Sequence, residues 1–371
     1  MHVYPSIYIY RSLWISCAIL LLLSTAKSTL ATLYDAKRPI HRDRPALDIK
    51  MTSTLPRPPY DKELGEVLAG LNLPPNITPE LIPVIRKMPI PAINDVIGEQ
   101  PISHEEHPID GPGGFISLSI FRSKSSETTT GLTHPGLFWI HGGGFFSGSR
   151  FANMQPQFDL VTDLDAVCVS VDYRLAPEHP DPAPLEDCYA ALVWVGENLH
   201  ELGIDPARLM IGGSSAGAGL AAGVSLYARD HGGPALCAQL LQYPMLDDRL
   251  ETLSSRQYVN EGTFSRGSCE TGWNALLGSR RGGKDVSIYA APGRATDLSG
   301  LPPAYIEVGS AETFRDENVA YASSLWAAGV QAELHVWPGA YHRFQAFAPK
   351  AALSKSADEA RVAWVKRTLS N

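Results

Sequence analysis

Short apolar runs alternate with amphipathic stretches along most of this chain. The apolar runs predict six strands, at 136–140, 166–171, 208–212, 238–243, 303–309 and 332–337. Between them lie patterns such as Ala190-Ala191-Leu192-Val193-Trp194-Val195, which suit helices that cross from one strand to the next. Strands that alternate with crossover helices predict an α/β fold, with a mostly parallel sheet covered by helices on both faces.

Two regions depart from this alternation. Residues 57–100 are rich in proline, with one helical stretch from Asp61 to Leu71. Residues 246–290 are polar, with helix-like pieces and a break at Gly282-Gly283. Both regions are expected to lie outside the sheet. The second either covers a site or forms a surface insertion without contact to a ligand.

The N-terminus follows a pattern of its own. Arg11 precedes an apolar stretch from Ser12 to Leu23, and the small residues Ser24-Thr25-Ala26 follow it. A basic residue, a short apolar stretch and small residues predict a secretory signal peptide over 1–26, or a membrane anchor if the leader is not cleaved. The alternative is a cytoplasmic protein that starts at Met51, with the first 50 residues a gene-model or isoform extension.

Composition limits the function classes. The 371 residues are 44% hydrophobic and 19% charged, enough for one extensive core with insertions. The net charge is −8 and no basic block occurs, so nucleic acid is not expected as a partner. Histidines and cysteines show no metal-ligand spacing, so no metal is expected. Cys168 and Cys237 lie in or beside apolar strands and are expected to be buried free thiols, which favours a reducing compartment.

Ser215 lies in the run Gly212-Gly213-Ser214-Ser215-Ala216-Gly217, between an apolar strand and a helix of small residues from Ala218 to Tyr227. A Gly-x-Ser-x-Gly run at a strand-to-helix corner is typical of a nucleophilic serine, because the tight turn lifts the hydroxyl toward a substrate. The alternative interpretation is a turn rich in glycine and serine without a catalytic role.

A second glycine-rich loop lies about 70 residues upstream. The strand at 136–140 ends in His141-Gly142-Gly143-Gly144-Phe145-Phe146. Glycines after a strand leave backbone N–H groups free to hold an oxyanion, and one such donor stabilises a transition state by roughly 2.7–4 kcal/mol. A phosphate-binding loop would need a different spacing. His141 is expected to orient the loop by hydrogen bonding.

A base and an acid follow downstream. His342 lies on a loop after the last predicted strand, where it can reach Ser215. The acid must lie between them in the chain, after the strand at 303–309, and spacing alone leaves Glu312, Asp316 and Glu317 open. The order serine, acid, histidine is the one that α/β-hydrolases use. Asp316 and Glu317 lie at the start of a predicted helix, where they favourably face its N-terminal dipole.

These motifs resemble the hormone-sensitive-lipase branch of the α/β-hydrolase fold esterases. Its members carry His-Gly-Gly-Gly, then Asp-Tyr-Arg-Leu-Ala-Pro-Glu, then Gly-Asp-Ser-Ala-Gly, and the middle motif is intact at Asp172 to Glu178. The resemblance covers roughly residues 60–370. It places the acid at Glu312, where the family usually has aspartate, and Ser214 replaces the aspartate that precedes the family's nucleophile. It also implies oxyanion donors at Gly143, Gly144 and Ala216.

The resemblance implies a serine carboxylesterase that hydrolyses short- to medium-chain acyl esters of small molecules without a cofactor. The alternative on the same fold is a non-catalytic small-molecule receptor, whose relatives have lost the histidine. The implied domains are a linker with lid helices at 27–105 and a catalytic domain at 106–371, with a lid insertion at about 246–290. Some relatives form homodimers. Asn76-Ile77-Thr78 is a glycosylation sequon if the chain is secreted.

Overall fold

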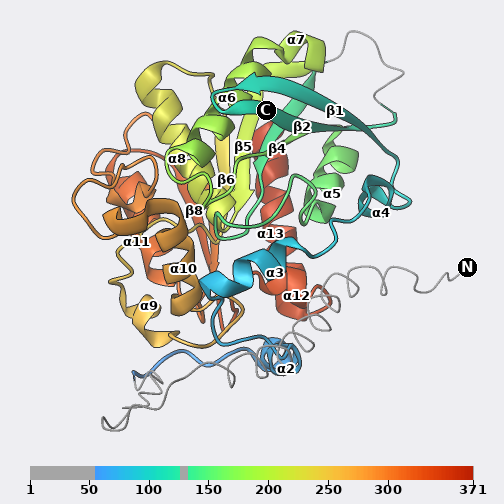
Figure 1. Cartoon of the computed structure of the whole chain (residues 1–371). Coiled ribbons are helices and arrows are strands. Elements are labelled where there is room, and N and C mark those ends of the chain that lie inside the picture. The colour runs from blue at the N-terminus through green and yellow to red at the C-terminus, as the bar shows by residue number, and fades with distance from the viewer. Residues whose placement is uncertain (1–54, 126–132, 371) are drawn as a thin grey trace, which may run out of the picture.

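An eight-stranded sheet forms the centre of the computed structural model, which describes residues 55–125 and 133–370 (Figure 1). The strand order is β1-β2-β4-β3-β5-β6-β7-β8. β2 runs antiparallel to both of its neighbours, and all pairs from β4 to β8 are parallel. The strands are β1 (Ile102–Gly111), β2 (Gly114–Ser123), β3 (His134–Ile140), β4 (Val167–Asp172), β5 (Ile204–Ser214), β6 (Ala238–Gln242), β7 (Ala304–Gly309) and β8 (Ala332–Trp337).

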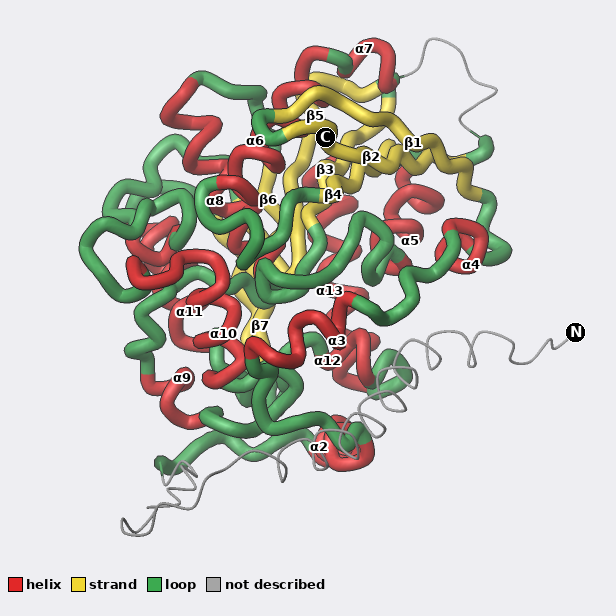
Figure 2. The backbone as a smooth tube through the Cα atoms, viewed as in Figure 1, coloured by secondary structure: helices red, strands yellow, loops and turns green. Residues whose placement is uncertain are grey.

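Helices cover both faces of the sheet, as the strand pattern predicted (Figure 2). One core contains side chains of α6, α8 and α11 together with one set of strand residues. The other contains α5, α13 and the alternate strand residues, among them Leu137 and Trp139 of β3. The covering helices are α5 (Gln155–Leu164), α6 (Ala183–Glu197), α7 (Leu199–Leu202), α8 (Ala216–His231), α11 (Arg315–Ala327) and α13 (Ala352–Leu369). The short helix α12 (Phe344–Phe347) packs in a separate, smaller cluster with Ala340 and Tyr341.

The two regions that departed from the alternation form short helices, most of them beside one end of the sheet, whereas α4 lies beside α5 (Figure 1). We call residues 55–97 the N-terminal lid segment and residues 246–295 the lid insertion. The first holds α2 (Lys62–Gly70), η1 (Pro79–Leu81), α3 (Ile82–Arg86) and α4 (Ile93–Ile97), and the second holds α9 (Leu253–Gln257), α10 (Arg266–Leu277), η3 (Gly278–Arg280) and η4 (Pro292–Arg294).

Hydrogen bonds join the N-terminal lid segment to the rest of the chain. Asp61 donates its N–H to the carbonyl of Gly339 at 3.0 Å, on the turn after β8. Ile77 donates its N–H to Ser268 Oγ at 2.8 Å, in α10. The segment therefore bridges the lid insertion and the turn that precedes His342.

The hairpin of β1 and β2 was not among the predicted strands. Only Ile102 and Ile109 of β1 are buried, and Ser, His and Glu occupy much of the remainder, so the strand has no continuous apolar run. β1 begins at Ile102, so the sheet starts four residues before the catalytic domain boundary expected at 106. Pairing with β2 along its whole length stabilises β1 in place of core packing.

A buried ion pair joins the last helix to the sheet. Arg361 of α13 donates from Nη1 to Glu307 Oε1 of β7 at 3.0 Å, and both side chains are almost fully buried. Gln242 Nε2 donates to the same oxygen at 2.9 Å. An unpaired buried charge is costly, so docking of α13 and burial of Glu307 depend on each other.

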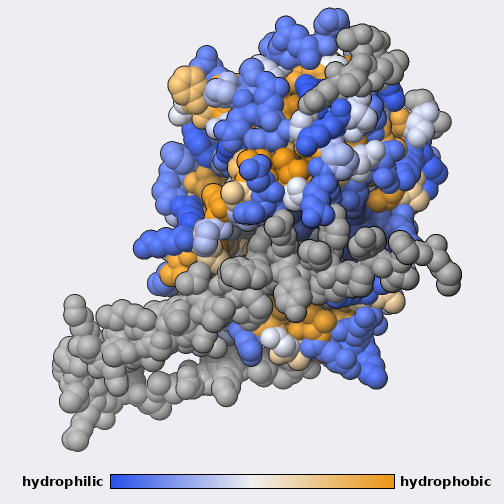
Figure 3. All heavy atoms as spheres, turned by 90° about the vertical axis from the view of Figure 1, so that its right-hand side faces the viewer, coloured by the Kyte–Doolittle hydropathy of each residue, from blue (hydrophilic) through white to orange (hydrophobic). Residues whose placement is uncertain are grey.

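The surface drawn in Figure 3 is mainly hydrophilic over the described residues, with apolar residues in small groups between. In the described part of the chain, no helix is both long and apolar enough to cross a membrane. The predicted leader at 1–26 and the alternative start at Met51 lie outside the described residues.

Candidate active site

Ser215 occupies the corner between β5 and α8, in a strained backbone conformation. Its φ is 57° and its ψ is −122°, a region that side-chain-bearing residues rarely adopt. The surrounding chain holds this conformation: Ser215 donates its N–H to the carbonyl of Gln242 at 2.9 Å and accepts from the N–H of Gly219 at 3.0 Å. This is the geometry expected of a nucleophile elbow.

Gly213 and Gly217 of the motif have no room for a side chain, because neighbouring backbone atoms lie very close to them. A Cβ atom at Gly213 would lie 2.4 Å from the carbonyl oxygen of Gly217. A Cβ atom at Gly217 would lie 2.2 Å from the carbonyl oxygen of Ile140. Any side chain at either position would force the corner open and move Ser215.

The structure brings Ser215, His342 and Glu312 together. His342 Nε2 lies 2.9 Å from Ser215 Oγ, and His342 Nδ1 lies 3.2 Å from Glu312 Oε1. All three side chains are buried. Because an ionised carboxylate only accepts hydrogen bonds, Nδ1 carries the proton in that state and Nε2 is free to accept from the serine hydroxyl. The other oxygen of Glu312 accepts from Gly309 N–H at 3.3 Å.

Aromatic rings enclose the imidazole of His342. Tyr243 and Phe314 meet it edge-on, with ring centroids 4.8 and 5.1 Å away, and Phe264 of the lid insertion lies 5.6 Å away. Thr263 of the same insertion donates its hydroxyl proton to the carbonyl of His342. The lid insertion therefore contacts the histidine directly, while its contact with a substrate stays a prediction.

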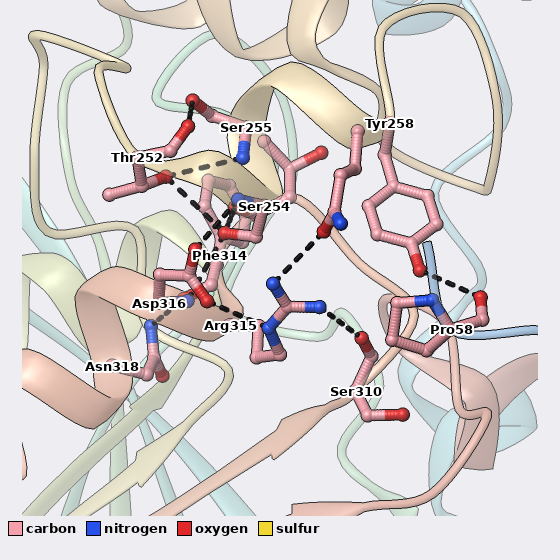
Figure 4. A network of polar contacts seen from close by, with 12 residues as sticks. Pro58, Thr252, Ser254, Ser255, Tyr258, Ser310, Phe314, Arg315, Asp316 and Asn318 are labelled. Carbon is pink, nitrogen blue, oxygen red and sulfur yellow. Dashed lines mark hydrogen bonds and ion pairs between the residues drawn. The ribbon is translucent and has the colours of Figure 1, made fainter. Parts of the chain in front are cut away.

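The loop that carries Glu312 is fixed by a polar network (Figure 4). Asp316 Oδ2 accepts from Ser254 N–H at 2.7 Å, and Ser254 Oγ donates to the carbonyl of Thr313 at 2.8 Å. Arg315 donates to Asp316 Oδ1 at 2.7 Å and to the carbonyl of Ser310 at 2.9 Å. Among the three open acids, Asp316 thus binds α9 and Arg315, and only Glu312 reaches His342.

The carbonyls of Gly142 and Gly143 in the glycine loop are hydrogen-bonded to nearby groups, whereas the N–H groups of Gly143 and Gly144 have no acceptor among the described residues. The carbonyl of Gly142 accepts from His141 Nδ1 at 2.8 Å, and that of Gly143 accepts from Ser147 N–H at 3.0 Å and Ser147 Oγ at 2.9 Å. Within residues 55–125 and 133–370, no acceptor bonds the N–H groups of Gly143, Gly144 and Ala216. The three predicted donors are thus unengaged.

His141 orients this loop, as predicted from its position. Burial lowers the pKa of His141, so the ring is neutral at pH 7, and its Nδ1 proton goes to the Gly142 carbonyl. The ring stacks on Tyr173 with centroids 4.3 Å apart. Tyr173 in turn donates its hydroxyl proton to the carbonyl of His141 at 3.0 Å.

Asn76 of the sequon, in the N-terminal lid segment, contacts the lid insertion. Its side-chain amide makes contacts of 2.7 Å with Asn260 and 2.6 Å with Ser265 Oγ. A Cβ atom at Gly267 would lie 2.2 Å from its Oδ1. A glycan at Asn76 stays a prediction, and it would have to displace these contacts.

Sequence reasoning missed Thr263, Phe264 and Arg86, which contact the histidine or the glycine loop. No local motif marks them, because their roles depend on how the lid folds over the sheet. Cys168, Cys188, Cys237 and Cys269 are free thiols, and burial raises their pKa values. Among the described residues, no group of three or more His, Cys, Asp or Glu side chains could hold a metal ion.

Fold and site together define the class of ester hydrolases built on an α/β sheet, and the comparisons with known proteins agree. A model of the alpha/beta hydrolase fold family matches residues 137–346. Carboxylesterase NlhH of Mycobacterium tuberculosis is 39% identical over 241 residues, which cover 63% of this chain and 74% of the relative. Esterase LipI of the same organism is 36% identical over 234 residues, covering 61% and 70%.

Solved structures are similar over more of the chain. A bacterial heroin esterase aligns with a TM-score of 0.75 and 36% identity, covering 84% of this chain and 98% of that chain. An esterase of Rhizomucor miehei aligns with a TM-score of 0.74 and 30% identity, covering 85% and 99%. The chain belongs to the alpha/beta hydrolase fold family, and it is a serine carboxylesterase.

Proposed function

We propose that this carboxylesterase hydrolyses short- to medium-chain acyl esters of small molecules, with Ser215 as nucleophile, His342 as base and Glu312 as acid. The observation that carries the proposal is the continuous chain of contacts from Ser215 Oγ through His342 to Glu312. A receptor on this fold would lack the base, so the receptor alternative is not adopted.

The reaction proceeds in two acyl-transfer steps. His342 Nε2 takes the proton of Ser215 as Oγ attacks the ester carbonyl, and Glu312 holds the imidazolium that forms. The N–H groups of Gly143, Gly144 and Ala216 stabilise the oxyanion. The tetrahedral intermediate expels the alcohol, which takes the proton from His342, and leaves the acyl group on Ser215. Water activated by His342 then releases the carboxylic acid.

The first test measures hydrolysis of p-nitrophenyl esters from C2 to C12. We expect the highest kcat/KM between C2 and C8, and a loss of at least about 10⁴-fold in Ser215→Ala, because the nucleophile is removed. Ser214→Ala is the matched control: its hydroxyl has no hydrogen-bond partner among the described residues, so most activity should remain. Full activity in Ser215→Ala would refute the nucleophile, and activity only on the longest esters would indicate a lipase.

The same assay distinguishes the acids. We expect Glu312→Ala to lower kcat by about 10³–10⁴-fold, as loss of the acid does in other serine hydrolases. Asp316→Ala should act mainly on stability, because Asp316 holds Ser254 and Arg315. A larger loss of kcat in Asp316→Ala than in Glu312→Ala would show that the acid is misassigned.

We also propose that the leader directs the protein to the secretory pathway or anchors it in a membrane. Translation from Met51 would give a cytoplasmic enzyme instead. No nucleic-acid partner is proposed, because the net charge is −8 and no basic block occurs. A homodimer remains part of the proposal, and light scattering on the purified protein would decide between monomer and dimer.

A further inference from the structure

Arg86, the last residue of α3, extends from the N-terminal lid segment into the catalytic domain. Its Nη1 donates to both carboxylate oxygens of Glu178 at 2.7 Å. Its Nε donates to the carbonyl of Phe146 at 2.6 Å, and Nη2 donates to the carbonyl of Ala176 at 2.5 Å. The planar guanidinium presents these donors in a fixed arrangement, so the three acceptors are held in place relative to one another.

The two carbonyls flank an existing contact between loops. Ala176 donates its N–H to the carbonyl of Phe145 at 3.0 Å, which joins the glycine loop to the loop after β4. Arg86 bonds the next carbonyl on the glycine loop, that of Phe146, and the carbonyl of Ala176 itself. It therefore closes a ring of hydrogen bonds around this junction.

The glycine loop depends on such bonds for its shape. Gly143 and Gly144 have φ values of 126° and 62°, and glycines have no side chains to restrict their peptide planes. Phe146 donates its N–H to the carbonyl of Gly143 at 3.2 Å. This carbonyl and the N–H of Gly144 belong to the same peptide group, so they move together. A shift of Phe146 is therefore transmitted to the proposed oxyanion donors.

We infer that Arg86 is a positioning residue for the oxyanion donors: its bonds to the carbonyls of Phe146 and Ala176 hold the N–H groups of Gly143 and Gly144 where the oxyanion forms. The inference rests on the proposed function. Because Arg86 ends α3, docking of the N-terminal lid segment and alignment of the glycine loop occur together. A lid that only covers the site would not couple these two events.

The chain offers a matched control in Arg208. Its Nε donates to Asp205 at 2.8 Å, and its other nitrogens donate to the carbonyls of Thr133 at 2.9 Å and Leu369 at 3.4 Å. Its side chain is 25% exposed, the same as that of Arg86. Arg208 thus also joins a carboxylate to two main-chain carbonyls. It lies in the first half of β5, whereas Ser215 follows the last residue of that strand.

The experiment compares Arg86→Met, Arg86→Lys and Arg208→Met in the full chain with p-nitrophenyl butyrate. We expect Arg86→Met to lower kcat by about 10–100-fold with KM changed less than about threefold, since loss of a whole oxyanion donor costs about 10²–10³-fold. Arg86→Lys keeps the positive charge but lacks the planar guanidinium that donates to several acceptors at once, so kcat should stay at least about fivefold below wild type. Arg208→Met should leave kcat within about twofold while lowering the melting temperature.

A transition-state analogue separates positioning from general stability. A trifluoromethyl ketone adds to the serine and forms an oxyanion, so its inhibition constant should rise in Arg86→Met by the factor by which kcat/KM falls. The inhibition constant of the product butyrate should not change. The inference is overturned if kcat in Arg86→Met stays within about twofold of wild type, or if the whole loss is in KM. If Arg86→Met does not fold, the same comparison is made with Arg86→Lys. If the wild-type protein is inactive on all esters, the proposed function itself is rejected.

Discussion

Glu317 is a buried carboxyl group that the proposed chemistry does not use. It lies in the first turn of α11 and accepts the N–H of Leu246 at 2.8 Å, so it fastens the start of the lid insertion to this helix. Its other oxygen, Oε2, has no hydrogen-bond partner among the described residues. Burial raises the pKa of Glu317 well above its usual value. The sequence predicted Glu317 at the start of a helix, where the structure places it, and the structure adds the bond to the backbone N–H of Leu246.

Glu317 should make stability fall as pH rises. The unfolded chain loses this proton near the usual pKa of glutamate, but the folded protein keeps it to a higher pH, so between the two pKa values the folded state binds more protons. Each pKa unit by which the folded state exceeds the unfolded state lowers the free energy of unfolding by about 1.4 kcal/mol once the pH is above both pKa values. Glu317→Gln keeps an acceptor for Leu246 and removes the charge, so its gain in melting temperature over wild type should be larger at pH 8 than at pH 5.

The control for this effect is Glu63→Gln, because Glu63 is exposed and also accepts one backbone N–H, that of Ala352 at 3.0 Å. We expect it to change the melting temperature little at either pH. If the gain in melting temperature of Glu317→Gln over wild type is equal at pH 5 and pH 8, or greater at pH 5, Glu317 is ionised in the folded protein across this range.

At the scale of the element, α8 is shaped by its glycines. A Cβ atom at Gly219 would lie 2.2 Å from the carbonyl oxygen of Met245, and one at Gly223 would lie 2.0 Å from that of Tyr289. The two positions are four residues apart and so lie on one face of the helix. This face lets Met245, just before the lid insertion, and Tyr289, near its end, pass directly against the helix that begins after Ser215.

Gly223→Ala should therefore destabilise the protein. Alanine in a helix interior is normally favoured over glycine by about 0.5–1 kcal/mol, but overpacking against a backbone carbonyl typically costs about 1–3 kcal/mol. Gly65→Ala in α2 is the comparison, since its Cβ atom would meet only Tyr60 Cβ at 3.4 Å, an ordinary contact. Urea unfolding midpoints should fall for Gly223→Ala and rise or stay level for Gly65→Ala. A higher urea midpoint for both variants would mean that the backbone at Tyr289 can move away from the added methyl group at little cost in stability.

The elements differ in how well the sequence predicts them. All six parallel strands were predicted, five of them because their buried portions are largely apolar. β8 is a partly exposed edge strand, and it was predicted from its short run of apolar residues. β1 was missed because its stabilising contacts are backbone bonds to β2, which leave no apolar pattern. For the site, Ser215 and His342 follow from local motifs, while Glu312 needed the family resemblance to be separated from Asp316. Arg86 has no local signal, since its partners at 146, 176 and 178 are distant in sequence.

At the scale of the whole molecule, the fate of the N-terminus decides where the enzyme works. We expect the full chain, expressed in a secreting eukaryotic cell, to appear in the medium without residues 1–26. The same expression tests the sequon, because a glycan at Asn76 would have to displace the amide contacts that join the two parts of the lid. Peptide masses before and after glycosidase treatment measure both. Retention in the cytoplasm with Met51 at the N-terminus would contradict the secretory proposal.

The pairing of Arg361 with Glu307 has a consequence for how the fold assembles. Glu307 belongs to β7, and its partner Arg361 lies 54 residues later in the chain, on α13. An unpaired buried carboxylate is costly, so the strand that leads to Glu312 reaches full stability in the sheet only when α13 has docked. A chain truncated before α13 should therefore hydrolyse esters poorly, although it keeps Ser215, Glu312 and His342.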